Sequence, residues 1–199
     1  MTKRELQAFV GKKHEESEIR EFVEKYNYEL TKDISLINKL IVTNQLPEDI
    51  IQDLIFYSAS DIWPGGRLNF VDLIQYQNLS AKFLDKFCRR FDSRIWRALP
   101  YYQHLTHKFI VDNIEKFDLR ILLESTKMEE KTLDEIWNYL QSSFDIQVLT
   151  IKTQKMSDKF ICKHAKEINI PAVLMYKDDL TDETYRMLKK FEDNKKKKK

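Results

Sequence analysis

Short apolar stripes, each preceded by a capping residue, follow one another along most of the chain. In residues 1–32, Ile19, Phe22, Val23 and Tyr26 recur at the spacing of one helix face and predict an N-terminal helix. Further along, an apolar residue repeatedly stands before a Ser, Thr or Asp, and another apolar residue follows that polar residue by four positions. This order is typical of a helix N-terminus closed by a hydrophobic staple. The pattern predicts an all-α protein of short helices, each of two to three turns.

Two kinds of predicted helix start alternate along the chain. In the first, Leu or Met precedes a hydroxyl cap, as at Ser80, Thr106, Ser157 and Thr181. In the second, Phe precedes an Asp cap, as at Phe91-Asp92, Phe117-Asp118 and Phe144-Asp145, with Trp96, Leu122 and Leu149 as the staple partners. Because these Asp residues recur at the same place in each unit, we expect them to cap helices rather than to form an acidic catalytic set. The phenylalanines are expected in the core.

The chain also repeats itself. Residues 76–96 align with residues 102–122 at a shift of 26, and nine of the 21 positions are identical. The identical residues of the first copy are Tyr76, Gln77, Leu79, Lys82, Phe83, Phe91, Asp92, Arg94 and Ile95. A fixed period of this size indicates stacked repeats, since each short helix pair needs neighbours to bury its apolar face. We therefore predict an N-terminal capping segment at 1–32, an α-solenoid-like array of about five helix pairs at 33–191, and a basic disordered tail at 192–199.

Composition and charge narrow the class of protein. Only three glycines and four prolines are present, which disfavours a turn-rich β fold and excludes glycine-rich phosphate cradles. The formal charge of +2 includes five lysines at the C-terminus, so the other residues carry 29 basic against 32 acidic groups. Cys88 and Cys162 lie inside predicted helices and resemble buried reduced thiols more than a disulfide framework. With no predicted signal peptide or transmembrane segment, we expect a soluble protein of a reducing compartment.

Chemistry-bearing residues form no recognisable catalytic or metal-binding pattern. His104 and His107 stand three apart, but a second pair of ligands to complete a four-ligand site is missing. Cys162 and His164 stand two apart and would point to different sides of a helix. Tyr101 and Tyr102 could stack a nucleic-acid base, but we expect them to pack between helices. The sequence therefore predicts a protein that is not an enzyme and holds no metal or cofactor.

Two stretches are candidate contact sites. Between residues 80 and 108, seven basic residues outnumber two acidic ones, a local charge of +5 that suits phosphates or an acidic partner. The candidate contact residues are Lys82, Lys86, Arg89, Arg90, Arg94 and Arg97. The second stretch, Trp63-Pro64-Gly65-Gly66, is the strongest turn signal of the chain and predicts its longest loop between helices. It is either a plain connector or a binding loop carrying Trp63.

The recurring phrases resemble short helical repeats of uncharacterised proteins from large DNA viruses and phages, whose units read like "kLSeeFIekhidkldW..Is.yQ". The matching segments are Tyr76 through Phe83, Tyr102 through Ile110 and Gln154 through Ile161. The resemblance brings no catalytic residue. It implies a viral origin and a binding or structural role, in the virion or the host cytoplasm. We accordingly expect a non-catalytic scaffold or adaptor that binds viral or host proteins, such as a minor capsid component. The alternative is a nucleic-acid-binding protein using the basic stretch and the lysine tail.

Overall fold

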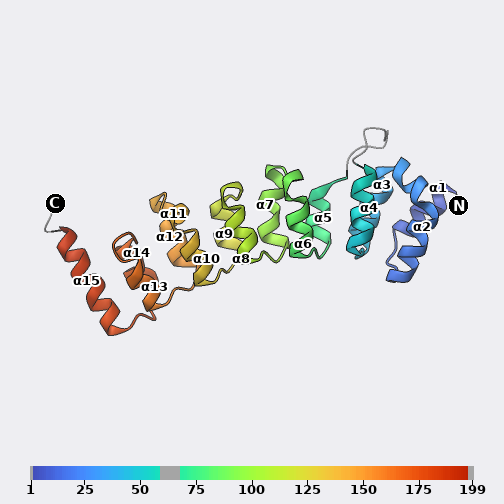
Figure 1. The fold of residues 1–199 in the computed structure, drawn as a ribbon. Coiled ribbons are helices and arrows are strands. Elements are labelled where there is room, and N and C mark those ends of the chain that lie inside the picture. Colours follow the sequence, from blue (N-terminus) through green and yellow to red (C-terminus); the bar gives the residue numbers. More distant parts are fainter. Residues whose placement is uncertain (1, 59–67, 197–199) are drawn as a thin grey trace. The chain divides into compact units, whose positions relative to one another are not determined.

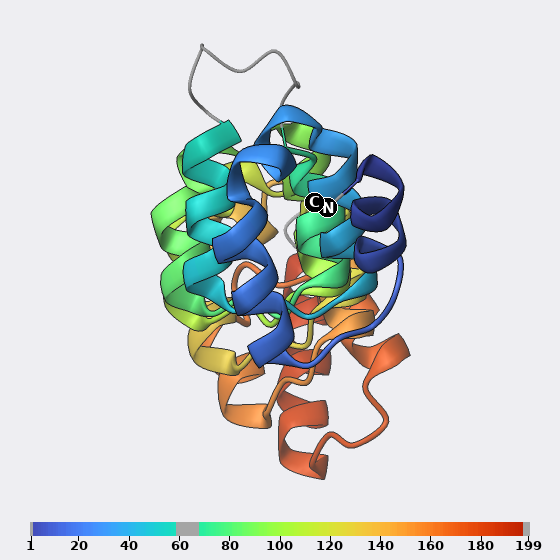
Figure 2. The ribbon, with the colours of Figure 1, turned by 90° about the vertical axis from the view of Figure 1, so that its right-hand side faces the viewer.

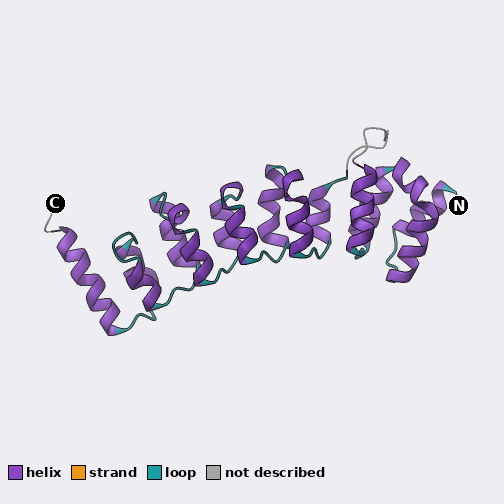
Figure 3. Ribbon diagram, viewed as in Figure 1, coloured by secondary structure: helices purple, strands orange, loops and turns teal. Residues whose placement is uncertain are grey.

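A computed structural model describes residues 2–58 and 68–196 of the chain, and the protein is helical throughout these ranges. They contain fifteen α-helices and two 3-10 helices joined by short loops, and no strand (Figure 3). The prediction of an all-α protein is therefore confirmed. The chain divides into two compact units, Met1–His104 and Leu105–Lys199, a boundary that the sequence pattern did not predict. The loop predicted around Trp63 lies outside the described residues.

The first unit consists of α1 to α7 and one 3-10 helix (Figure 1). Their bounds are α1 Lys3–Val10, α2 Glu16–Lys32, α3 Ile34–Thr43, α4 Glu48–Ser58, α5 Phe70–Tyr76, α6 Ala81–Phe87, η1 Cys88–Arg90 and α7 Ser93–Tyr102. Helix α3 packs against α1 and α5, and α5 packs in turn against α7. Helix α2 contacts both α3 and α4. Figure 2 shows α1 and α2, in blue, facing the viewer.

The second unit consists of α8 to α15 and the other 3-10 helix (Figure 1). Their bounds are α8 His107–Asp112, η2 Ile114–Lys116, α9 Leu119–Ser125, α10 Glu130–Glu135, α11 Trp137–Leu140, α12 Phe144–Thr153, α13 Asp158–Lys163, α14 Ile170–Tyr176 and α15 Asp182–Lys196. Helix α12 packs between α9 and α14, α8 packs against α10, and α14 contacts α15. The predicted disordered tail began at residue 192, but α15 continues to Lys196, so that boundary is wrong.

The hydroxyl caps form as predicted. The Ser80 hydroxyl oxygen accepts from the Phe83 N–H at 3.1 Å, and the Thr106 hydroxyl oxygen accepts from the Phe109 N–H at 3.3 Å. Phe83 and Phe109 are each 1% exposed, so the two copies of this phrase place the same residue in the same local setting. Ser157 and Thr181 cap α13 and α15 in the same way. A hydroxyl in this position satisfies an amide that has no partner inside its own helix.

One of the three predicted aspartate caps is wrong. Asp92 and Asp118 cap α7 and α9 as expected. Helix α12, however, is capped by Ser143, whose hydroxyl oxygen accepts from the Ile146 N–H at 3.2 Å. The serine starts the helix two residues before Asp145, so Phe144 becomes the first helical residue and is 71% exposed rather than buried in the core. Ser is as good a cap as Asp, and the earlier position prevails here.

The N-terminal helix agrees with its apolar stripe over most of its length. Ile19, Phe22 and Val23 are buried on one face of α2. At Tyr26 the backbone leaves helical geometry, with φ −119° and ψ 20°, so the stripe does not continue straight through that residue. A second short helix, α1, precedes it and ends at Gly11. The prediction of a helical N-terminal segment is confirmed.

A glutamine side chain joins the C-terminus of one helix to the C-terminus of an earlier helix at several places in the chain. Gln77, the C-cap residue of α5, is 2% exposed. Its side-chain nitrogen donates to the carbonyl oxygens of Ile41 and Asn44 at 2.5 and 2.6 Å, at the C-terminus of α3. Its side-chain oxygen accepts from the Leu46 N–H at 2.7 Å. One amide thus satisfies three backbone groups, which uses both donors and one acceptor of the side chain.

The same three bonds recur at two other helix ends, and we call the three residues Gln77, Gln103 and Gln154 the glutamine clamps. Gln103 donates to the carbonyl oxygens of Ile74 and Gln77 and accepts from the Leu79 N–H. Gln154 donates to the carbonyl oxygens of Leu123 and Thr126 and accepts from the Met128 N–H. In each case the bonds hold the C-terminus of one helix beside that of a helix earlier in the same unit.

Acidic side chains at the opposite helix ends make a second recurring link. The Glu48 carboxylate accepts from both the N–H and the hydroxyl of Ser80, and the Glu130 carboxylate accepts from the same two groups of Ser157. The Asp158 carboxylate does so at Thr181. The cap hydroxyl therefore serves two helices at once, since it accepts from its own helix and donates to an acid on another.

Candidate functional site

The predicted basic contact residues lie exposed on three consecutive elements of the first unit. Lys82 and Lys86 stand one turn apart on α6, and Lys86 donates to the side-chain oxygen of Gln52 on α4. Arg89 and Arg90 form part of η1. Arg94 and Arg97 lie on α7, so all six predicted basic residues are exposed on the first unit.

Neighbouring side chains already engage part of this basic surface. The Arg90 guanidinium lies over the Phe70 ring, 5.7 Å from its centroid. Arg94 donates to the Asp92 carboxylate at 2.9 Å. The pKa of Asp92 is lowered by this hydrogen bond and by the Ile95 N–H that the carboxylate caps. Because the ion pair is exposed, it contributes little to stability and leaves Arg94 able to exchange partners.

Three tyrosines lie exposed at the C-terminal ends of adjacent helices, contrary to the expectation that the Tyr101-Tyr102 pair packs inside. Tyr101 and Tyr102 on α7 are 58% and 48% exposed, and Tyr76 on α5 is 40% exposed. The clamp bond from Gln103 to the Gln77 carbonyl oxygen, 2.7 Å, brings the two helix ends together. We call Tyr76, Tyr101 and Tyr102 the tyrosine surface. Arg94 and Arg97 precede Tyr101 on α7 by seven and four residues, spacings that place the three side chains on one face of the helix.

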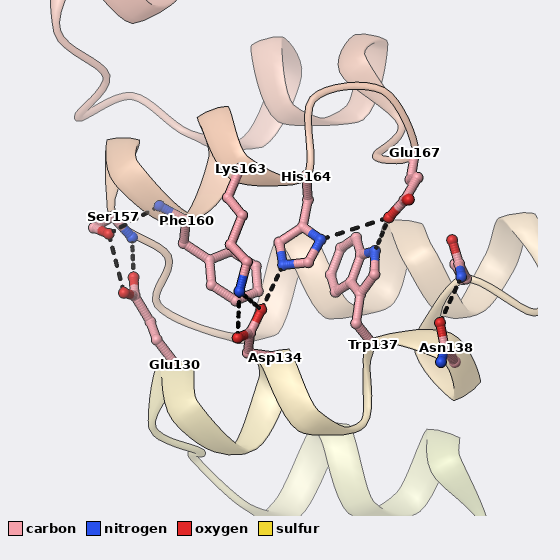
Figure 4. Close-up of polar contacts among 10 residues, drawn as sticks. Glu130, Asp134, Trp137, Asn138, Ser157, Phe160, Lys163, His164 and Glu167 are labelled. Carbon is pink, nitrogen blue, oxygen red and sulfur yellow. Dashed lines mark hydrogen bonds and ion pairs between the residues drawn. The ribbon is translucent and has the colours of Figure 1, made fainter.

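A polar cluster that sequence reasoning missed lies between α10 and the end of α13 (Figure 4). The His164 ring nitrogen Nε2 is 2.8 Å from Asp134 Oδ1, and Nδ1 is 3.6 Å from Glu167 Oε2. Lys163 donates to the same Asp134 carboxylate, and Trp137 Nε1 donates to Glu167 Oε2 at 3.1 Å. The pKa of Asp134 is lowered, first by the Lys163 hydrogen bond and then by that of His164.

The cluster contains the Asp–His pair of a general base, but a substrate cannot reach the imidazole. An Asp–His pair at hydrogen-bond distance orients an imidazole for proton transfer, provided that its other nitrogen reaches a substrate. Here the other nitrogen faces Glu167, and the rings of Trp137 and Phe160 stand 4.4 and 4.6 Å from the imidazole. His164 is 8% exposed. The arrangement suits a link between α10–α11 and α13 better than catalysis. No local sequence motif predicts this cluster, because Asp134 and His164 are 30 residues apart.

Neither cysteine is buried as predicted: Cys162 is exposed and Cys88 is partly exposed. His107, one of the two histidines singled out in the sequence, bonds within its own unit. His107 Nδ1 is 3.0 Å from the Thr132 hydroxyl, and Nε2 is 3.3 Å from Glu135 Oε1, both on α10. Within residues 2–58 and 68–196, no three His, Cys, Asp or Glu side chains lie together as metal ligands would. In the same ranges, no helix combines the length and apolar character needed to cross a membrane.

Comparison with known proteins adds no family to this picture: no family model, no curated protein and no solved structure matches the chain.

Proposed function

We propose that the protein is a non-catalytic helical-repeat scaffold that binds other proteins, with the helices of residues 33–191 arranged as stacked pairs. The observation that carries this proposal is that the recurring polar residues make structural hydrogen bonds. The cap hydroxyls, the cap aspartates Asp92 and Asp118, and the clamp glutamines bond to backbone or to a neighbouring helix. Residues that recur in this way are typical of an architectural repeat, and stacked helix pairs present extended surfaces to protein partners.

The tyrosine surface is the contact region that this function would use. Tyrosine supplies a large contact area with few rotatable bonds and is enriched at protein interfaces. Tyr76, Tyr101 and Tyr102 lie at the joined ends of α5 and α7, and the two α7 rings are 6.3 Å apart. Arg94 and Arg97 extend the same face of α7 with positive charge, which favours a partner that combines apolar and acidic side chains.

The setting of the scaffold follows from the resemblance to viral repeat proteins. We propose a minor capsid or other virion component, or an adaptor that engages a host protein in the host cytoplasm. The repeated phrases support this setting, and the proposal assigns no catalytic role and no cofactor.

Affinity capture tests the function when it is run with surface variants. The wild-type chain is used as bait beside a triple variant, Tyr76→Ala, Tyr101→Ala and Tyr102→Ala, and beside Tyr185→Ala as a matched control. Tyr185 is 46% exposed on α15, in the other unit. We expect proteins captured by the wild type and the control to be lost from the triple variant. An identical set of captured proteins for all three baits would refute the tyrosine surface as the contact site.

Nucleic-acid binding is the second candidate, because Lys82, Arg89 and Arg90 are exposed on the same unit as Arg94, Arg97 and the three tyrosines. Basic residues beside exposed aromatic rings suit a phosphate backbone with unstacked bases. A salt titration of binding to random duplex DNA and to single-stranded RNA separates the two candidates. A steep loss of affinity with increasing salt supports nucleic-acid binding, and no binding at low salt removes it.

A further inference from the structure

The last position in the series of glutamine clamps holds a lysine. Lys177 is the C-cap residue of α14, as Gln77 is of α5 and Gln154 of α12. Its ammonium donates to the Gln154 carbonyl oxygen at 2.5 Å, and that oxygen belongs to the C-cap residue of the preceding helix in the series. Lys177 therefore reproduces part of the donor side of a clamp.

The acceptor side of this clamp is missing. In the three glutamine clamps, the side-chain oxygen accepts from a backbone N–H two residues after the preceding C-cap, at Leu46, Leu79 and Met128. For Lys177 the preceding C-cap is Gln154, so the equivalent N–H belongs to Met156, a residue that is 6% exposed. An ammonium group has donors and no acceptor. Within the described part of the chain, no hydrogen bond from the Met156 N–H is found.

A hollow on the protein surface is lined by both Met156 and Lys177. It is an open surface depression of about 530 Å³, and Met128 and Met156 supply its apolar lining. The charged side chains that line it are Glu129, Glu130, Lys155, Lys177 and Asp179. Glu130 is already engaged by Ser157. Burial lowers the pKa of the Lys177 ammonium, the negative charge of Asp179 partly opposes this shift, and the positive charge of Lys127 adds a smaller lowering. Because acids and bases nearly balance, the hollow favours a neutral acceptor over a free anion.

We propose that this hollow binds an amide carbonyl of an extended peptide segment from a partner protein, with a glutamine side chain as the best fit. The carbonyl oxygen would accept from the Met156 N–H and would thus take the place that Gln154 Oε1 takes at Met128. The proposal rests on the proposed protein-binding function and names a contact in the second unit, away from the tyrosine surface.

Amide NMR of the full ¹⁵N-labelled chain tests the site with two small probes, N-acetylglutamine methylamide and N-acetylglutamate methylamide. For ligands of this size we expect a dissociation constant of roughly 1 mM. The glutamine probe should shift the Met156 amide signal saturably, and the glutamate probe should bind at least about threefold more weakly because the hollow already holds three carboxylates. No saturable shift at Met156, or equal binding of the two probes, would overturn the proposal.

The variant Lys177→Gln supplies the missing acceptor from within the chain. We expect its Met156 amide signal to move downfield without any probe and its affinity for the glutamine probe to fall about tenfold. Lys159→Gln changes an exposed lysine on α13 that does not line the hollow, so it should retain the affinity. Unchanged probe binding by Lys177→Gln would contradict the proposal, and the wild-type titration stands alone if that variant does not fold. Failure here leaves the capture test on the tyrosine surface unaffected, so the two proposals fail separately.

Discussion

Replacing Gln77 by glutamate keeps the shape of the side chain and removes both of its amide donors. The Leu46 N–H keeps its acceptor, but the carbonyl oxygens of Ile41 and Asn44 then face a carboxylate instead of an NH₂ group. Two buried hydrogen bonds are lost and two acceptors are left unsatisfied. At about 1–3 kcal/mol for each of the two unsatisfied groups, we expect the first unit to lose about 2–6 kcal/mol.

Protonation of the introduced carboxylate limits this loss of stability and makes the loss depend on pH. A buried carboxylate beside two carbonyl oxygens binds a proton more readily than one in water, and the protonated form regains one donor. The stability difference between the wild type and Gln77→Glu should therefore shrink as the pH falls. Urea unfolding, followed by circular dichroism at two pH values, measures this stability difference. Hydrogen exchange of the Leu46 amide shows whether the difference arises at the Gln77 clamp.

Gln75→Glu is the matched control, since Gln75 lies two residues earlier on α5 and is exposed. It introduces the same charge without touching a clamp, so we expect a change within about 0.5 kcal/mol. Equal urea midpoints for Gln77→Glu and Gln75→Glu would show that the glutamine clamp does not hold α3 and α5 together, and the reasoning would fail.

Three further outcomes follow from particular contacts. Phe144→Ser should change the free energy of unfolding by less than about 0.5 kcal/mol in urea melts, because Phe144 is 71% exposed. Ser157→Ala should cost about 1–2 kcal/mol in the same assay, since it removes a helix cap and a link to another helix. Lys163 and His164 lower the pKa of Asp134, so its contribution is present above the ordinary aspartate range and is lost as the pH falls below it. Asp134→Asn should therefore reduce stability at pH 7 and flatten its decline in acid.

The local parts of the fold could be predicted because their causes are local. A hydroxyl or carboxylate cap such as Ser80 or Asp92 bonds to amides two or three residues away, and the staple residues stand at fixed offsets from it. Phe144 shows the limit of this reasoning. Two neighbouring residues could each cap the helix, and the pattern gave no way to choose Ser143 over Asp145.

The clamps and the polar cluster could not be predicted, since their partners are distant in sequence. Gln77 bonds to Ile41 and Asn44, which lie 36 and 33 residues earlier. The only trace in the sequence is the repeated Tyr-Gln pair at residues 76–77 and 102–103, whose recurrence was visible but whose role was not. The exposure of the tyrosines has the same origin: the glutamine turns into the neighbouring helix end, and the tyrosine before it lies at the surface.

We propose that the chain iterates a helix-pair module that needs its neighbours in order to fold. Circular dichroism of a synthetic peptide covering residues 79–104, which contains α6, η1 and α7, tests it directly. The account predicts a largely unfolded peptide with no cooperative thermal transition, because helices of seven and ten residues are too short to be stable alone. A helical peptide that melts cooperatively, at a temperature independent of its concentration, would contradict the claim.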